Sequence, residues 1–202
     1  MHVDKLINSI LELKNGNIRN SIDQRIGEFK NLGKKSGNEI FKELCFCLLT
    51  ANFNAARAIK IQSEIGDGFL NLSEKRLAAT LRALGYRYPN IRAKYIVEAR
   101  KYARGRTPRI DRDWLVKNIK GLGYKEASHF LRNIGHENFA IIDFHIIDLL
   151  VRHNLAERPK TLTRSKYIEI ENLLRKIAKK SGLTLAELDL YLWYMETGKV
   201  LK

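Results

Sequence analysis

The stretch that decides the fold runs from Asp111 to Gly135 and reads DRDWLVKNIKGLGYKEASHFLRNIG. Apolar residues recur at helical spacing on both sides of Gly121-Leu122-Gly123, which predicts one helix before the glycines and another after them. Two glycines around a single apolar residue are typical of a tight hairpin whose backbone can approach a ligand closely. We therefore predict two helices joined by a glycine hairpin over about residues 111–135, with Leu122 tucked into the core between them.

The hairpin is a candidate nucleic-acid contact. Its amides are expected to point outward at the N-terminus of the second helix, where N–H groups and the helix dipole favour a phosphate. Gly121 and Gly123 are then DNA-binding residues of a helix-hairpin-helix motif, which holds a strand by its backbone without reading sequence. An ordinary corner between two helices is the alternative interpretation.

Lys125 lies two residues past Gly123, in the first turn of the second predicted helix. The positive end of the helix dipole disfavours an ammonium at this position. Only the neutral amine of a lysine is a nucleophile, so this position suits a catalytic lysine. The alternative is a solvated charge, since Lys125 is one of 37 basic residues.

Asp143 directly follows the apolar run Ala140-Ile-Ile142. A carboxylate at the end of a buried run is either a helix N-cap or a functional acid, and it can be both. In a partly dry cleft it can accept the proton of an attacking amine and offset positive charge on a sugar ring. We predict that Lys125 and Asp143 are the catalytic pair, with a simple cap for the helix that follows as the alternative.

The charge of the chain indicates the class of partner. Lys and Arg number 37 against 22 Asp and Glu, which gives a net charge of +15. Such an excess is usually kept for a polyanion, so nucleic acid is the leading candidate and an acidic membrane surface the second. No apolar run approaches the length of a bilayer span, and the N-terminus lacks the apolar segment of a signal peptide. We expect a cytoplasmic protein.

Almost every segment has helical periodicity. One run, Phe139–Ile142, could pass for a strand, but a single strand makes no sheet. We predict an all-α fold of about ten helices. Helix starts are predicted at Ser73, Asp111 and Thr184, and helix ends at Gly85, Gly135 and Gly182.

The length of 202 residues suits one globular domain or two small lobes that share a core, and we treat residues 1–202 as a single domain. One candidate linker runs from Tyr102 to Asp113 and would separate a helical first half from the half that carries the chemistry. It is either a basic loop that touches phosphates or a solvated connector. Its four arginines are Arg104, Arg106, Arg109 and Arg112.

The residues predict neither a metal site nor a cofactor. Cys45 and Cys47 are separated by one residue in an apolar stretch, so they cannot face each other on a helix and are expected to be core residues. His145 and His153 are too far apart on one predicted helix to form a ligand pair at i, i+4.

Two further regions are candidate contacts. Asn52 and Arg57 lie where a loop meets a helix start, and a helix capped by Asn54 with Arg57 on the surface is the alternative. Asp189 and Trp193 lie four apart on one helical face, so a hydrogen-bonding carboxylate and a stacking indole can share a base pocket. A core tryptophan is the alternative there.

These motifs together resemble a known family. Gly121-Leu-Gly-Tyr-Lys125 followed by Ile142-Asp143 is similar to the hairpin and downstream aspartate of the helix-hairpin-helix DNA glycosylase superfamily. The longer string KEASHFLRN from Lys125, with AIID at 140–143 and WY…TGK…K at 193–202, resembles the type-2 8-oxoguanine DNA glycosylases of archaea and a few bacteria. The resemblance covers essentially the whole chain, starting around Arg25.

The resemblance implies a two-lobed helix-hairpin-helix DNA glycosylase fold with the active-site cleft between helical lobes. It implies a bifunctional 8-oxoguanine DNA glycosylase/AP lyase of base excision repair, in which Lys125 forms a Schiff base, Asp143 is its partner and β-elimination follows. The expected partner is double-stranded DNA containing 8-oxoguanine. We expect a monomer at the nucleoid of a prokaryotic cytoplasm, without a membrane or a cofactor. The alternative is a non-enzymatic helix-hairpin-helix DNA-binding module, which does not need the pairing of Lys125 with Asp143.

By the same resemblance, Asn52 and Arg57 fill the gap left by the flipped base and touch the orphaned cytosine, and the chain end at Lys202 folds back to the base pocket. Cluster-bearing relatives place four cysteines near the C-terminus, where this sequence has none. One departure is Phe144, which stands where family members commonly have a basic residue; a phosphate or pocket contact is then missing or replaced.

Overall fold

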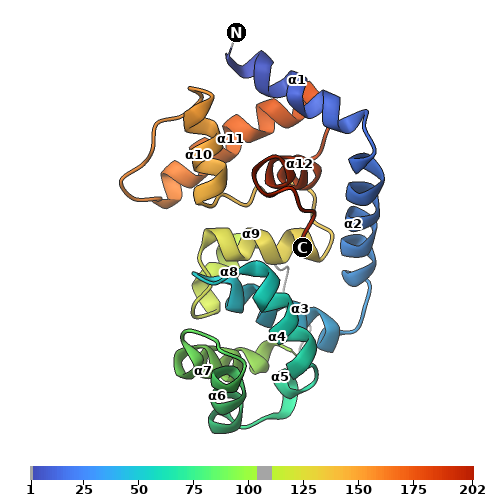
Figure 1. Cartoon of the computed structure of the whole chain (residues 1–202). Coiled ribbons are helices and arrows are strands. Elements are labelled where there is room, and N and C mark those ends of the chain that lie inside the picture. The colour runs from blue at the N-terminus through green and yellow to red at the C-terminus, as the bar shows by residue number, and fades with distance from the viewer. Residues whose placement is uncertain (1, 104–110) are drawn as a thin grey trace. The chain divides into compact units, whose positions relative to one another are not determined.

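The computed structural model describes residues 2–103 and 111–202 of the chain. In that part, twelve α-helices and one 3-10 turn occur and no strand, which confirms the predicted all-α fold (Figure 1). The number of helices exceeds the expected ten, partly because the one-turn helix α5 (Gly68–Asn71) is too short to show helical periodicity in the sequence.

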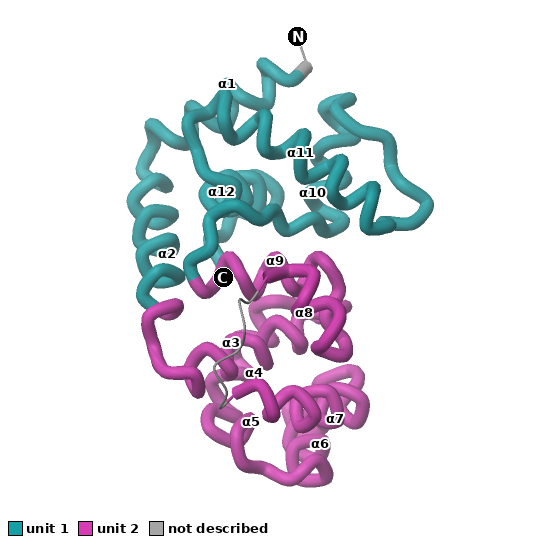
Figure 2. The backbone as a smooth tube through the Cα atoms, turned by 180° about the vertical axis from the view of Figure 1, so that it is seen from behind, with its two compact units in different colours: residues 1–31, 135–202 teal, residues 32–134 magenta. Residues whose placement is uncertain are grey.

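The chain divides into two compact units (Figure 2). Unit 1 comprises residues 1–31 and 135–202, and unit 2 comprises residues 32–134. The helices of unit 1 are α1 (His2–Lys14), α2 (Ile18–Leu32), α10 (Phe144–Arg152), α11 (Arg164–Ser181) and α12 (Leu185–Thr197). Those of unit 2 are α3 (Gly37–Thr50), α4 (Ala55–Ile65), α5, α6 (Glu74–Ala83), α7 (Pro89–Ala99), η1 (Arg100–Tyr102), α8 (Arg112–Asn118) and α9 (Tyr124–Asn133).

The linker prediction is wrong as a boundary, because residues on both sides of it belong to unit 2. The N-terminal helices pack instead on the C-terminal part of the chain. Ile22, Ile26 and Phe29 of α2 share one buried cluster with Ala186, Leu190 and Tyr191 of α12. Arg104, Arg106 and Arg109 lie outside the described residues.

The apolar run Phe139–Ile142 forms neither helix nor strand, and side chains of α11 bind its backbone. The Ala140 N–H donates to the Glu171 carboxylate at 3.0 Å, and the Ile142 N–H donates to the Tyr167 hydroxyl at 3.2 Å. The same hydroxyl donates to the Ala140 carbonyl at 2.7 Å. These bonds satisfy a buried backbone without a sheet. The run therefore delivers Asp143 to the start of α10.

Other features of the described residues bear on the sequence predictions. Cys45 and Cys47 are free thiols, fully buried in α3, which confirms them as core residues. Burial raises the pKa of the Cys45 thiol.

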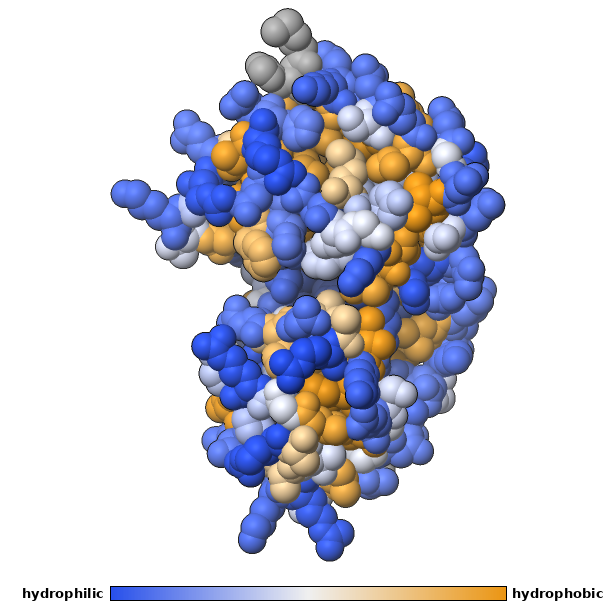
Figure 3. Space-filling model, in the orientation of Figure 1, coloured by the Kyte–Doolittle hydropathy of each residue, from blue (hydrophilic) through white to orange (hydrophobic). Residues whose placement is uncertain are grey.

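No helix in the described ranges is long and apolar enough to cross a membrane. Hydrophilic residues cover much of the face shown in Figure 3.

Candidate active site

The glycine hairpin joins α8 to α9 in unit 2, as predicted. Gly121 has a φ of +85°, and a Cβ atom there would lie 2.5 Å from the ring of Tyr95. Gly121 is therefore needed both for the left-handed backbone and for the close approach of α7. Leu122 is 5% exposed, so it does enter the core.

Glu126 closes the hairpin, a feature that sequence reasoning missed. Its Oε2 accepts the N–H of Gly123, the N-cap of α9, at 3.2 Å. An acidic residue at the third helical position reaches back to the N-cap in this way, so the spacing from Gly123 was the available signal. The Gly123 amide is thus engaged within the motif, whereas the sequence predicted that it points outward.

Lys125 is the second residue of α9, where it was predicted. Its side chain is 28% exposed, and its Nζ lies 3.7 Å from Oε1 of Glu126. One carboxylate group therefore contacts both the hairpin backbone and the lysine. This arrangement holds the amine beside the hairpin while leaving it accessible to a ligand.

Arg112 supports α9 and does not lie in an open basic loop. It is 9% exposed, its Nη1 donates to the Ser128 hydroxyl at 3.2 Å, and its guanidinium lies 5.1 Å from the Tyr124 ring. The Tyr124 hydroxyl donates to the Asp113 carboxylate. The sequence suggested a phosphate-touching or solvated Arg112, and the structure corrects this because α8 packs the side chain against α9.

Asp143 lies in unit 1 as the N-cap of α10. Its Oδ1 accepts the Ile146 N–H at 3.0 Å. Asp143 is therefore a helix cap, which was the alternative that the sequence left open. A cap occupies one carboxylate oxygen and leaves the charge in place, so a catalytic role is compatible with it.

Trp193 of α12 lies beside the start of α10. The rings of His145 and Trp193 meet edge to face with centroids 5.0 Å apart. The Nε1 atom of Trp193 is buried and has no hydrogen-bond acceptor among the described residues. One turn earlier on α12, Asp189 is 9% exposed, and Lys202 is half-buried at the end of the same unit.

The Asn52 and Arg57 region is a structured corner of unit 2. Asn52 has a φ of +55°, and Asn54 caps α4 by accepting the Arg57 N–H at 3.0 Å. The Arg57 guanidinium donates to the Gly85 carbonyl at 2.9 Å and lies 5.0 Å from the Phe53 ring. The alternative interpretation, a helix capped by Asn54 with Arg57 on the surface, is therefore confirmed. A DNA contact of the exposed Asn52 and Arg57 stays a prediction.

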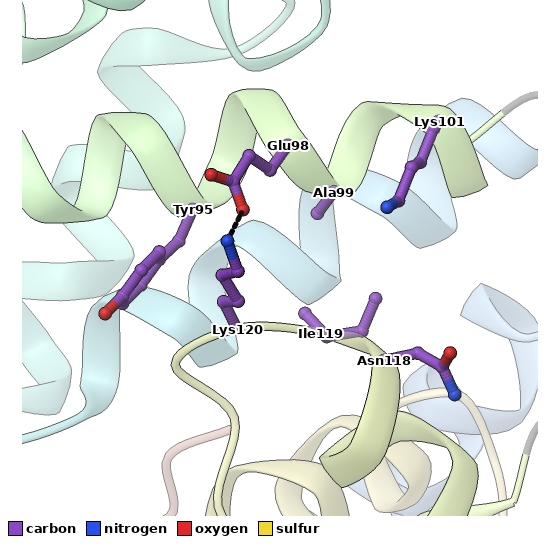
Figure 4. A pocket seen from close by; sticks show the side chains of 7 residues that line it. All are labelled: Tyr95, Glu98, Ala99, Lys101, Asn118, Ile119 and Lys120. Carbon is purple, nitrogen blue, oxygen red and sulfur yellow. Dashed lines mark ion pairs between the residues drawn. The ribbon is translucent and has the colours of Figure 1, made fainter.

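A pocket of about 350 Å³ lies in unit 2, and its lining includes residues 118–120, which directly precede the hairpin in the sequence (Figure 4). Nζ of Lys120 lies 2.9 Å from Oε2 of Glu98 on α7, and this hydrogen bond lowers the pKa of Glu98. The pocket contains none of the predicted site residues. Within residues 2–103 and 111–202, no group of three or more His, Cys, Asp or Glu is placed to hold a metal ion.

Known proteins are similar to this chain over its full length. The family model described as 8-oxoguanine DNA glycosylase matches residues 22–183. The 8-oxoguanine DNA glycosylase/AP lyase of Korarchaeum cryptofilum is 53% identical, over 100% of both chains.

Two solved structures are similar to it as well. One is Methanocaldococcus jannaschii 8-oxoguanine glycosylase/lyase in complex with a 15mer DNA containing 8-oxoguanine. It has a TM-score of 0.94 at 53% identity, with 98% of this chain and 100% of that one covered. The 8-oxoguanine DNA glycosylase of Thermotoga maritima has a TM-score of 0.92 at 42% identity, with 99% and 100% covered.

Proposed function

We infer the roles of individual residues from the premise that this chain belongs to the 8-oxoguanine DNA glycosylase family. It is an 8-oxoguanine DNA glycosylase/AP lyase, an enzyme of base excision repair and not a non-enzymatic DNA-binding module. The observation that carries the assignment of its nucleophile is the position of Lys125, in the first turn of the helix that follows the glycine hairpin.

The first step is capture of double-stranded DNA and extrusion of the damaged nucleotide. The net charge of +15 attracts the phosphate backbone, and the hairpin around Gly121 and Gly123 holds it through amides other than that of Gly123, which donates to Glu126. Extrusion costs a few kcal/mol, less for a damaged or poorly paired base. Asn52 and Arg57 cover the gap in the duplex and contact the unpaired cytosine.

Lys125 then acts as the nucleophile. Its neutral amine attacks C1′, the bond from C1′ to the base nitrogen breaks, and the base leaves with its electron pair and takes up a proton. Opening of the sugar ring converts the new C–N bond to an imine, the Schiff base. Loss of a C2′ proton allows β-elimination, which breaks the bond from C3′ to its oxygen and nicks the strand.

Asp143 accepts the proton that the attacking amine releases, and its charge offsets the positive charge that develops on the sugar. Its position as N-cap supports this role, because the bond to the Ile146 N–H fixes the direction of the carboxylate. The same residue is thereby structural and catalytic.

The base pocket is formed in unit 1 by Asp189, Trp193 and Lys202. The Trp193 indole supplies a face on which the base can stack. Asp189 supplies an acceptor for the N7 proton that 8-oxoguanine has and guanine lacks. The enzyme acts as a monomer, in the cytoplasm at the nucleoid.

Borohydride trapping tests the assignment of Lys125. Wild-type protein incubated with an 8-oxoguanine duplex and borohydride should form a covalent adduct, whereas Lys125→Gln should bind the duplex and form none. Lys120→Gln, which removes another lysine beside the same hairpin, is the matched control and should still be trapped. An adduct formed by Lys125→Gln at the wild-type rate would remove Lys125 from the mechanism.

A further inference from the structure

Phe144 is the most exposed large hydrophobic residue in the part of the chain that the structure describes. It is 62% exposed, against 42% for Ile91 and 39% for Tyr88. Isolated exposed hydrophobic residues are common on protein surfaces, so exposure alone indicates no function. The position of Phe144 and its contacts distinguish it from the others.

Phe144 is the first residue of α10 and directly follows Asp143, which caps that helix. Consecutive Cα atoms are about 3.8 Å apart, so the Phe144 side chain starts one peptide away from the proposed catalytic carboxylate. A DNA strand whose sugar reaches Asp143 therefore passes within reach of the Phe144 ring.

The Phe144 ring is held by a series of aromatic contacts. Its centroid lies 4.0 Å from that of His145, with the two planes tilted by 36°. His145 in turn meets Trp193 edge to face, at 5.0 Å and 89°. Part of the Phe144 ring thus packs on His145, and the rest of the ring is accessible.

We propose that the exposed face of Phe144 stacks on a base that flanks the extruded nucleotide. Extrusion separates the target from its neighbours in the stack and so uncovers a base face beside the gap. An aromatic ring stacks on every base, which suits an enzyme that meets its lesion in all sequence contexts. This proposal rests on the proposed role of Asp143 at the sugar.

The charge of the chain favours DNA over a second copy as the partner of Phe144. Two copies of a chain with a net charge of +15 repel each other, whereas the same charge brings DNA to the surface. A phenyl ring neutralises no phosphate, so Phe144 adds affinity that is independent of counterion release.

Binding to a non-cleavable duplex tests the proposal. A tetrahydrofuran abasic analogue replaces the lesion, and 2-aminopurine occupies a flanking position as a fluorescent reporter of stacking. Wild-type protein should change the fluorescence, and Phe144→Ala should lose that change and bind about 5- to 150-fold more weakly, the equivalent of ~1–3 kcal/mol per stacked base. The slope of log affinity against log salt should stay the same, and Phe144→Tyr should behave as wild type.

Two controls make the result specific. Phe144→Leu keeps an apolar side chain without a ring and should also lose the fluorescence change, whereas Ile91→Ala should keep both signal and affinity. The assay involves no chemistry, so its outcome is independent of whether Lys125 is trapped by borohydride. The proposal is overturned if Phe144→Ala keeps the signal and the affinity, or if sedimentation shows a wild-type dimer that Phe144→Ala abolishes.

Discussion

The carboxylate of Asp143 accepts the backbone N–H of Ile146 at 3.0 Å, so the proposed catalytic carboxylate is also the N-cap of α10. An N-cap side chain contributes about 1 kcal/mol to stability. Catalysis depends on the negative charge, whereas capping depends only on an acceptor oxygen. The two contributions can therefore be separated by substitution.

Asp143→Asn should keep the cap and lose the charge. We expect single-turnover base excision to fall by a factor on the order of 10² to 10⁴. The free energy of unfolding should change little, because the amide oxygen can still accept the Ile146 N–H. Asp143→Ala should lose the activity and also about 0.5–2 kcal/mol of stability, measured by urea unfolding.

Thr163→Ala is the matched control for the cap. Thr163 caps α11 of the same unit by accepting the Lys166 N–H, and it has no proposed part in the chemistry. Its loss should lower stability by a similar amount and leave excision intact. A well-folded Asp143→Asn with wild-type activity would reduce Asp143 to a helix cap.

Gly121→Ala should destabilise unit 2 in two ways. The left-handed backbone at φ +85° costs a non-glycine residue roughly 1–2 kcal/mol. The new Cβ would also lie 2.5 Å from the Tyr95 ring, and overpacking of this kind costs about 1–3 kcal/mol more. Urea unfolding measures the sum.

Gly198→Ala separates these two costs. Gly198 also has a left-handed backbone, with φ +68° and ψ +16°, but no described residue beyond its chain neighbours lies within 4 Å of an added Cβ. It should show the backbone cost alone. Equal losses in the two variants would mean that the contact between the hairpin and Tyr95 is not tight.

Tyr86 should make stability fall at alkaline pH. Burial raises the pKa of Tyr86 above its ordinary value near 10, although the hydrogen bond from Arg92 opposes the shift. Below the ordinary pKa, near 10, Tyr86 keeps its hydroxyl proton in both the folded and the unfolded state, and its contribution to stability is complete. As the pH rises above that ordinary pKa, the unfolded chain loses this proton while the folded chain keeps it. Unfolding therefore becomes easier until the folded state also titrates.

Tyr86→Phe should therefore flatten the decline of unfolding free energy between about pH 9 and 11. The slope should not vanish, because burial also raises the pKa of Tyr191. At neutral pH the variant should lose on the order of 1 kcal/mol with the bond from its hydroxyl to the Leu49 carbonyl. An alkaline slope in Tyr86→Phe identical to that of the wild type would refute the explanation.

Sequence reasoning succeeded where structure is local. The caps at Ser73, Asp111 and Thr184 are present because a side-chain oxygen bonds to an N–H only three residues away. The hairpin, with Leu122 buried and Lys125 in the first turn, is set by residues that are neighbours in the chain.

It failed where distant segments meet. Nothing near α2 in the sequence shows that its apolar face packs on α12, so the boundary between the units was misplaced. Nor does the run Phe139–Ile142 reveal that Tyr167 and Glu171 satisfy its backbone. Glu126 was within reach of local reasoning, since it lies three residues after the N-cap Gly123.

Trp193→Phe and Trp193→Ala test whether the Trp193 ring stacks on the base. The phenyl ring keeps a stacking face and a ring contact for His145, and the Nε1 donor that it lacks is buried in the wild type. Trp193→Phe should therefore keep most of the excision of 8-oxoguanine. Trp193→Ala loses the stacking face and should excise 8-oxoguanine roughly 5- to 150-fold more slowly.

The matched control for Trp193 is a substrate and not a variant. A preformed abasic site has no base to read, so strand cleavage there by Lys125 should be nearly unchanged in both Trp193 variants. A truncation that lacks Gly198 to Lys202 should follow the same pattern, with lesion excision damaged far more than folding or cleavage at abasic sites. If the truncated protein excises 8-oxoguanine at the wild-type rate, or if Trp193→Ala loses both activities equally, the end of the chain is structural and the base is read elsewhere.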